Sequence, residues 1–116
     1  MPIKENKLPR IYSLKSRIEI DHLFDKGRRI FTDYFILIWE ETSQFKFGVF
    51  VSGKIKKAVE RNRIKRIFRE AIRQNREKLD KNYRIGILPK KTDKIVRFDV
   101  INAEISRMFS KLNSVE

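Results

Sequence analysis

The sequence predicts one α/β (α+β) two-layer sandwich with the order α-β-β-α-β-α, in which helices pack on a sheet of about four strands. Two observations carry this prediction. Apolar residues recur at helical spacing in three segments, and three others show the runs or alternation of strands. The 116 residues include 41% apolar side chains and no Pro/Gly/Ser-rich linker, which suits one modest core. Helices and strands mixed along such a chain pack in layers around that core.

The N-terminal part predicts a tail, a helix and room for a short strand. Residues 1–12 are polar and basic, and we interpret them as the tail of a single domain that spans residues 1–116. A helix is expected to begin at Ser16, because Ser16 and Glu19 fit a capping box, and to end at Gly27. The stretch 29–32 leaves room for one further short strand.

Two strands are expected next. Residues 34–39 are rich in β-branched and aromatic side chains and predict a well-buried strand. The polar residues 40–44 suit a hairpin connection to a second strand over 45–51, where apolar residues alternate. The alternation places Phe50 on the face opposite Phe47, which makes Phe50 a candidate for a groove rather than the core.

The C-terminal half predicts a helix, a strand and a second helix. From about Lys57 to Leu79 the apolar residues recur at helical spacing. A short strand is expected over 83–87, closed by Pro89. The last helix has an apolar face made of Phe98, Ile101, Ile105, Met108, Phe109 and Leu112.

The positive charge is concentrated in one segment. The net charge is +13, and residues 54–76 contain ten Lys or Arg but only two acids. On a helical wheel these cations lie outward, opposite the apolar face. A solvated face generally mixes signs, whereas like charges four residues apart repel, so a binding face is the stronger interpretation. The ten are Lys54, Lys56, Lys57, Arg61, Arg63, Lys65, Arg66, Arg69, Arg73 and Arg76.

This charge predicts a nucleic-acid partner. A membrane-surface helix needs exposed apolar residues opposite its cations, and here those residues are required for the core. Single-stranded RNA is bound by cations together with aromatic side chains that stack on bases. Most of the 13 aromatic residues must belong to the core, and for any single Phe the core stays the better interpretation. Phe24, Tyr34 and Phe50 are the candidates for a groove.

Composition excludes several kinds of catalytic and metal site. The chain has no cysteine and one histidine, His22, so Cys nucleophiles and multi-His metal sites are excluded. No apolar run approaches a membrane span and the start lacks a signal-peptide core, so we expect a cytoplasmic protein with no membrane partner. His22 with Asp21 or Asp25 could form a general-base site, but a solvated surface histidine is the stronger interpretation.

One sequence motif extends over residues 58–70 and carries charged residues at defined spacings. Residues 58–70 read AVERNRIKRIFRE, an Arg-Asn-x-x-Lys-Arg-x-x-Arg-Glu pattern that resembles the signature helix of the protein subunit of bacterial ribonuclease P. The similarity extends over about residues 11–112. It includes Leu14-Lys15, then Phe24-x-x-Gly27-Arg28, then Gly48-Val49-x-Val51-Ser52 followed by Lys54, Lys57, Ala58 and Val59.

The resemblance implies a fold and separate roles for the protein and RNA subunits. The family's βαβ unit has a left-handed crossover, against the general right-handed rule. Its RNA subunit cleaves precursor tRNA with Mg²⁺ held mainly by RNA. The protein binds that RNA and holds the single-stranded 5′ leader in a cleft between the first helix and the sheet. The resemblance therefore implies no catalytic residue, no metal ligand and no small-molecule substrate in this chain.

Site residues follow from the resemblance and the charged face. Where the family has Phe, Lys-Lys and Gly, this chain has Ile20, Gly53-Lys54 and Lys56, so leader contacts are expected to shift toward Lys56 or toward Lys90 and Lys91. Asn62 either hydrogen-bonds RNA or supports Arg61 or a neighbouring loop. The expected RNA-binding residues are Lys54, Lys56, Lys57, Arg61, Asn62, Lys65, Arg66, Arg69 and Arg73. The expected leader cleft comprises Ile20, Phe24, Tyr34, Phe50, Lys90 and Lys91.

A second interpretation is a structural module such as a ribosomal protein bound to ribosomal RNA. It would share the charge and the aromatic content. It would not require the Arg61-Asn62-x-x-Lys65-Arg66 spacing or a leader cleft. The identity of the RNA that the protein binds separates the two.

Overall fold

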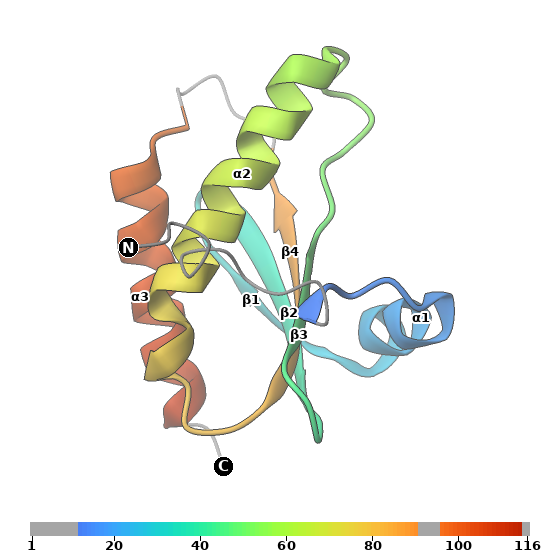
Figure 1. Cartoon of the computed structure of the whole chain (residues 1–116), viewed down its shortest axis with the longest axis vertical. Coiled ribbons are helices and arrows are strands. Elements are labelled where there is room, and N and C mark those ends of the chain that lie inside the picture. Colours follow the sequence, from blue (N-terminus) through green and yellow to red (C-terminus); the bar gives the residue numbers. More distant parts are fainter. Residues whose placement is uncertain (1–11, 91–95, 115–116) are drawn as a thin grey trace, which may run out of the picture.

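Four strands of the described chain form one mixed sheet in the order β1-β2-β4-β3 (Figure 1). The computed structural model describes residues 12–90 and 96–114. The predicted α/β packing and the additional short strand are confirmed. The elements are α1 (Arg17–Lys26), β1 (Arg28–Phe31), β2 (Phe35–Glu41), β3 (Lys46–Val49), α2 (Ala58–Asn75), the short 3₁₀ helix η3 (Arg76–Lys78), β4 (Tyr83–Pro89) and α3 (Phe98–Asn113).

The predicted hairpin over residues 40–44 is wrong. Strands β2 and β3 do not pair with each other, because β4 lies between them, antiparallel to β2 and parallel to β3. Strand β4 takes an inner position: its Tyr83, Ile85 and Ile87 are buried in the main core, while on the other face Gly86 is buried and Leu88 is half-buried. The link from β2 to β3 crosses the start of β4, where the Thr42 N–H donates to the Asn82 carbonyl over 3.0 Å. Strands β3 and β4 with α2 between them form a βαβ unit.

Helices cover the two faces of the sheet unequally. Helices α2 and α3 lie side by side on one face, and α1 lies on the opposite face (Figure 1). The main core between the sheet and α2/α3 includes the fully buried Phe35, Phe68 and Phe109. A smaller cluster joins α1 to the other face through Leu23 and Ile38. Much of the face that carries α1 therefore stays available for other contacts.

Helix α1 has the predicted ends, for partly different reasons. The Ser16 hydroxyl accepts from the Glu19 N–H over 3.3 Å, as the capping box predicts, but the Glu19 carboxylate contacts Lys46 and Arg84 instead of returning to Ser16. Gly27 ends the helix with φ of −67°, so it is not in the left-handed region. Glycine is needed there because a Cβ would lie 2.5 Å from the Leu23 carbonyl oxygen.

Candidate nucleic-acid interface

Helix α2 is amphipathic in the way the sequence predicts. Ile64, Phe68 and Ile72 are buried against the sheet and α3. The opposite surface carries the predicted RNA-binding residues of this helix, which are exposed or half-buried. They are Arg61, Asn62, Lys65, Arg66, Arg69 and Arg73.

Both acids of residues 54–76 are already paired with neighbouring arginines. Arg63 lies 3.3 Å from Glu60. Arg73 Nε donates to Glu70 over 3.0 Å. The hydrogen bond from Arg73 lowers the pKa of Glu70, and the same bond raises the pKa of Arg73, so both groups stay charged at neutral pH.

The remaining cations of the helix face have no such compensation. We call Lys65, Arg66 and Arg69 the free cationic row, because none of them forms a hydrogen bond or ion pair with another residue among 12–90 and 96–114. Like charges held on one face repel each other. An anionic ligand would turn this repulsion into attraction.

The loop before α2 adds three exposed lysines. Lys54, Lys56 and Lys57 precede the helix, and Lys57 takes the N-cap position without a side-chain cap hydrogen bond. Arg61 organises this loop, because its Nη1 donates to the carbonyls of Ile55 and Lys56 over 2.7 and 2.8 Å. Arg61 therefore holds the lysines beside the helix start in addition to carrying its own charge.

A groove lies between α1 and the chain that follows β3. The rings of Phe24 and Phe50 meet edge to face, with centroids 5.3 Å apart. With Ile20 they form the apolar wall of an open groove of about 620 Å³. The structure thus brings together three of the predicted cleft residues. The other lining residues are Arg17, Asp21 and Asp25.

Two glycines form the floor under Phe50. Gly48 of β3 and Gly86 of β4 are paired across the parallel strands. A Cβ on Gly48 would lie 2.8 Å from Cζ of Phe50, and one on Gly86 would lie 3.4 Å from Cε2. The missing side chains let the ring lie close to the sheet, which sets the depth of the groove.

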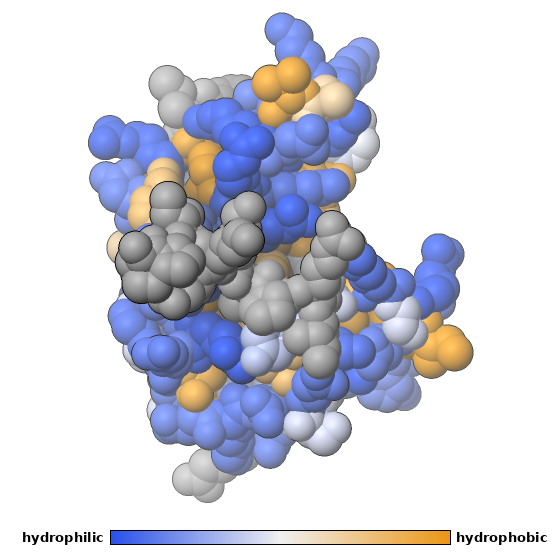
Figure 2. Space-filling model, viewed as in Figure 1, coloured by the Kyte–Doolittle hydropathy of each residue, from blue (hydrophilic) through white to orange (hydrophobic). Residues whose placement is uncertain are grey.

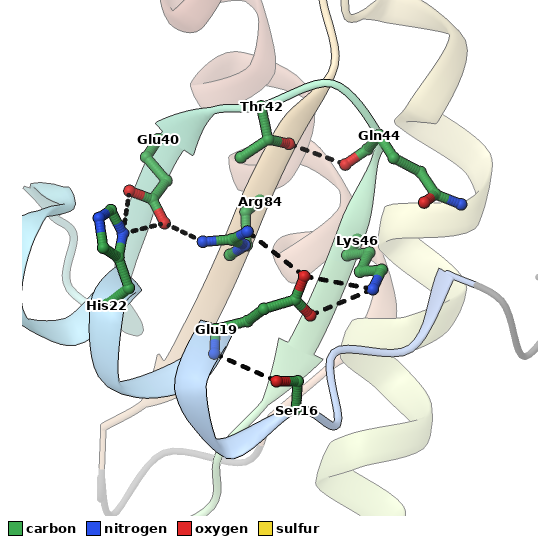
Figure 3. A network of polar contacts seen from close by, with 8 residues as sticks. All are labelled: Ser16, Glu19, His22, Glu40, Thr42, Gln44, Lys46 and Arg84. Carbon is green, nitrogen blue, oxygen red and sulfur yellow. Dashed lines mark hydrogen bonds and ion pairs between the residues drawn. The ribbon is translucent and has the colours of Figure 1, made fainter.

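A polar network fixes α1 on the sheet (Figure 3). Glu40 of β2 accepts from Arg84 of β4 over 2.6 Å, and Arg84 also reaches Glu19 of α1 over 3.4 Å. Lys46 of β3 contacts Glu19 over 3.1 Å. His22 contacts Glu40 over 3.0 Å, so the polar partner that the described chain gives this histidine is Glu40 and not Asp21 or Asp25. The network joins the helix to three strands.

The other predicted cleft residues lie elsewhere. Tyr34 packs against the main core cluster and not with Phe24 and Phe50. Lys90 is exposed just after β4, and its N–H donates to the Tyr34 carbonyl over 2.9 Å. Lys91 lies outside the described residues.

Sequence reasoning missed two kinds of residue. Ile36 and Leu88 pack, together with Phe24 and Phe50, against the small cluster of Leu14, Leu23 and Ile38, which we call the groove cluster. They alternate with buried residues of β2 and β4, and that alternation was the available signal. The charged residues of the polar network beneath α1 gave no sequence signal, because Glu19, Glu40, Lys46 and Arg84 come from four elements that are far apart in the sequence.

The surface of the described residues is mostly hydrophilic on the side shown in Figure 2, with apolar patches near the start of α2 and on the outer side of α1. Among the described residues, no helix is long and apolar enough to cross a membrane. In the same residues, no three His, Asp or Glu side chains gather as a metal site.

Known proteins resemble this chain over nearly its whole length. The family model described as Ribonuclease P matches residues 8–113. The Ribonuclease P protein component of Geotalea uraniireducens is 31% identical over 113 residues, covering 96% of this chain and 99% of the relative. That of Desulforapulum autotrophicum is 34% identical over 106 residues, covering 90% and 91%. The solved RNase P protein from Thermotoga maritima is similar in fold, with a TM-score of 0.75, 24% identity and coverage of 90% and 97%. The chain that carries this free cationic row and groove therefore belongs to the ribonuclease P protein family.

Proposed function

We propose that this chain is the protein subunit of ribonuclease P and assists a catalytic RNA subunit in removing the 5′ leader from precursor tRNA. The observation that carries the proposal is the free cationic row of Lys65, Arg66 and Arg69 beside the exposed loop lysines. Lys and Arg neutralise phosphates, and the planar guanidinium can contact two phosphate oxygens at once. Relatives named Ribonuclease P protein component support this assignment.

The groove is assigned to the single-stranded leader. Phe24 and Phe50 offer aromatic surface for bases, which stack on aromatic rings with little regard to sequence. Asp21 and Asp25 line the same groove. Their negatively charged carboxylates repel phosphates, but the carboxylate oxygens accept hydrogen bonds from base amino groups. A bound strand would therefore turn its bases toward α1 and its phosphates away from it.

Mg²⁺ is assigned to the RNA subunit. Mg²⁺ prefers octahedral oxygen ligands, usually one or two carboxylates together with phosphates and water. The described residues contain no cluster of three His, Asp or Glu side chains, and the proposal places the Mg²⁺ ions mainly on phosphates of the RNA. In this proposal the chain binds and orients RNA, contributes no catalytic residue, and works in the cytoplasm where precursor tRNA is made.

The test is cleavage of precursor tRNA at low Mg²⁺ by a bacterial ribonuclease P RNA, with and without this protein. We expect strong stimulation that requires the RNA, and no cleavage by the protein alone. Cleavage by the protein alone would contradict the assignment of catalysis. Tight, salt-dependent RNA binding without stimulation would instead favour a structural module such as a ribosomal protein.

A further inference from the structure

An apolar strip continues from the groove across the sheet to its β1 edge. Next to Phe50, Leu88 of β4 and Ile36 of β2 are half-buried and pack with the groove cluster. Ile36 pairs with Leu88 on one side and with Phe31 of β1 on the other. Directly opposed residues of antiparallel strands point to the same face. Phe31 is therefore the outer end of the strip.

Phe31 is a large aromatic side chain that lies exposed on the edge strand β1. Its exposed fraction is 64%, and it is the aromatic among the large apolar residues that the described chain leaves exposed. A single exposed apolar residue needs no explanation, but this one ends a contiguous apolar strip. Neighbouring strands are about 4.8 Å apart, so the strip extends about 14 Å from the β3 side to β1. That is a track for an extended ligand.

Cations accompany the strip. Arg29 precedes Phe31 by two residues on β1, so it projects to the same face. Its Nη2 donates to the carbonyl of Phe24, a groove residue, over 2.7 Å, which places a guanidinium beside the groove. Lys90 is exposed just after Leu88 and Pro89. Aromatic and apolar surface flanked by cations is the chemistry that binds single-stranded nucleic acid.

We propose that Phe31 is a stacking site for single-stranded RNA that extends the leader path from the groove, over Leu88 and Ile36, to the β1 edge. The inference rests on the proposed function, because it assigns more leader nucleotides to the same RNA-binding face. A second copy of this chain is a poorer occupant. Pairing two β1 strands would bring their exposed arginines, Arg28 and Arg29, close to one another.

The experiment uses the holoenzyme reconstituted with a bacterial ribonuclease P RNA. Its affinity is measured for precursor tRNAs whose leader is shortened one nucleotide at a time. Phe31→Ala is expected to weaken binding of the longest leaders at least about 5-fold, since stacking on one aromatic ring contributes about 1 kcal/mol or more. The shortest leaders should bind as they do to wild type. Phe31→Leu should behave like Phe31→Ala, because leucine has no π face.

Ile18→Ala is the matched control. Ile18 is 82% exposed and does not line the groove, so its replacement should leave the affinity for every leader length unchanged. If wild type responds to leader length and Phe31→Ala matches it throughout, the inference fails while the proposed function stands. If wild type does not stimulate cleavage, both fail. Sedimentation that shows a wild-type dimer and a Phe31→Ala monomer would assign this surface to self-association and overturn the inference.

Discussion

Arg84 and Glu40 face each other across the antiparallel strands β4 and β2, with Arg84 Nη1 2.6 Å from Glu40 Oε2 beneath α1 (Figure 3). Both side chains are mostly buried, with 16% and 14% of their surface exposed. The other terminal nitrogen of Arg84 reaches Glu19 of α1. One guanidinium therefore connects the helix that forms a groove wall to the centre of the sheet.

Replacing Arg84 should loosen this helix. Arg84→Met removes a charged donor from Glu40 and Glu19, and we expect it to lower the free energy of unfolding by about 1–3 kcal/mol. Urea denaturation measures the change. Arg107→Met is the control, because the Arg107–Glu104 pair lies on α3 and Arg107 is 57% exposed, so this replacement should cost less than about 1 kcal/mol. Equal decreases in the two variants would show that the network does not hold α1.

Gly27→Ala should destabilise the protein for a steric reason. An added Cβ would lie 2.5 Å from the Leu23 carbonyl oxygen and 2.7 Å from Cγ2 of Ile38, so the end of α1 must shift. We expect a destabilisation of about 1–3 kcal/mol by thermal or urea unfolding. Gly53→Ala is the control, since a Cβ there meets nothing within 4 Å. If both variants unfold alike, α1 is free to move and the close approach at Gly27 is not a constraint.

Local patterns predicted the elements but not the pairing of the strands. The helical spacing of apolar residues in α2 and α3, and the alternation that turns Phe50 toward the groove, depend only on residues close in sequence. The structure confirms both. The polar stretch 40–44 looked like a hairpin because a link across one intervening strand needs the same residues as a tight connection. The insertion of β4 depends on packing with residues far away in the sequence, since Ile85 and Ile87 are buried in the main core and Leu88 packs on the other face, and that packing is a property of the whole sheet.

The position of Tyr34 shows a second limit. Continued alternation from Ile36 would place Tyr34 on the groove side. The Thr32 hydroxyl instead accepts from the N–H groups of Tyr34 and Phe35, which closes a turn between β1 and β2. Tyr34 then packs toward the main core. A side chain that folds back on its own backbone overrides the strand period here.

The charged residues show a third limit. The sequence identified the cations of α2, but it could not separate those that are free from those with intramolecular partners. Arg73 is paired with Glu70, and Arg61 is bonded to loop carbonyls. This distinction depends on side-chain geometry, so variants of the two kinds should differ in effect.

The free cationic row should supply affinity without stability. Arg66→Ala and Arg69→Ala are each expected to weaken binding to ribonuclease P RNA. Each should also reduce the slope of log affinity against log salt by about 0.7 to 0.9 for every phosphate that the variant no longer neutralises. The free energy of unfolding, measured by thermal denaturation, should stay within about 0.5 kcal/mol of the wild-type value. Lys111→Ala removes the same charge from an exposed position near the end of α3 and should leave the slope unchanged. An unchanged slope in the α2 variants would exclude this row from the interface.

The Glu70–Arg73 pair should add a small acid-sensitive contribution to stability. The hydrogen bond from Arg73 lowers the pKa of Glu70 below its ordinary 4.5. A carboxyl whose pKa is lowered on folding stabilises the protein at neutral pH, and this contribution disappears as the pH falls through the lowered pKa. Because the Glu70 side chain is 41% exposed, solvent screening should keep it below about 1 kcal/mol. Glu70→Gln should therefore lose less stability than wild type between neutral pH and pH about 3, as urea midpoints would show. An identical decrease in both proteins would exclude the pair as the cause.

Arg61 is expected to matter more than a single phosphate contact. Arg61→Met removes one charge and also the two hydrogen bonds to the carbonyls of Ile55 and Lys56, so the loop with its exposed lysines is no longer held beside α2. Affinity for RNA should fall further than in Lys65→Met, which removes an equal charge from the free cationic row. Amide hydrogen exchange of residues 54–57 should accelerate in Arg61→Met and stay unchanged in Lys65→Met, because only the first variant releases the loop backbone. If the two variants weaken binding equally and neither alters exchange, Arg61 contributes its charge alone, and the loop lysines are positioned by other contacts.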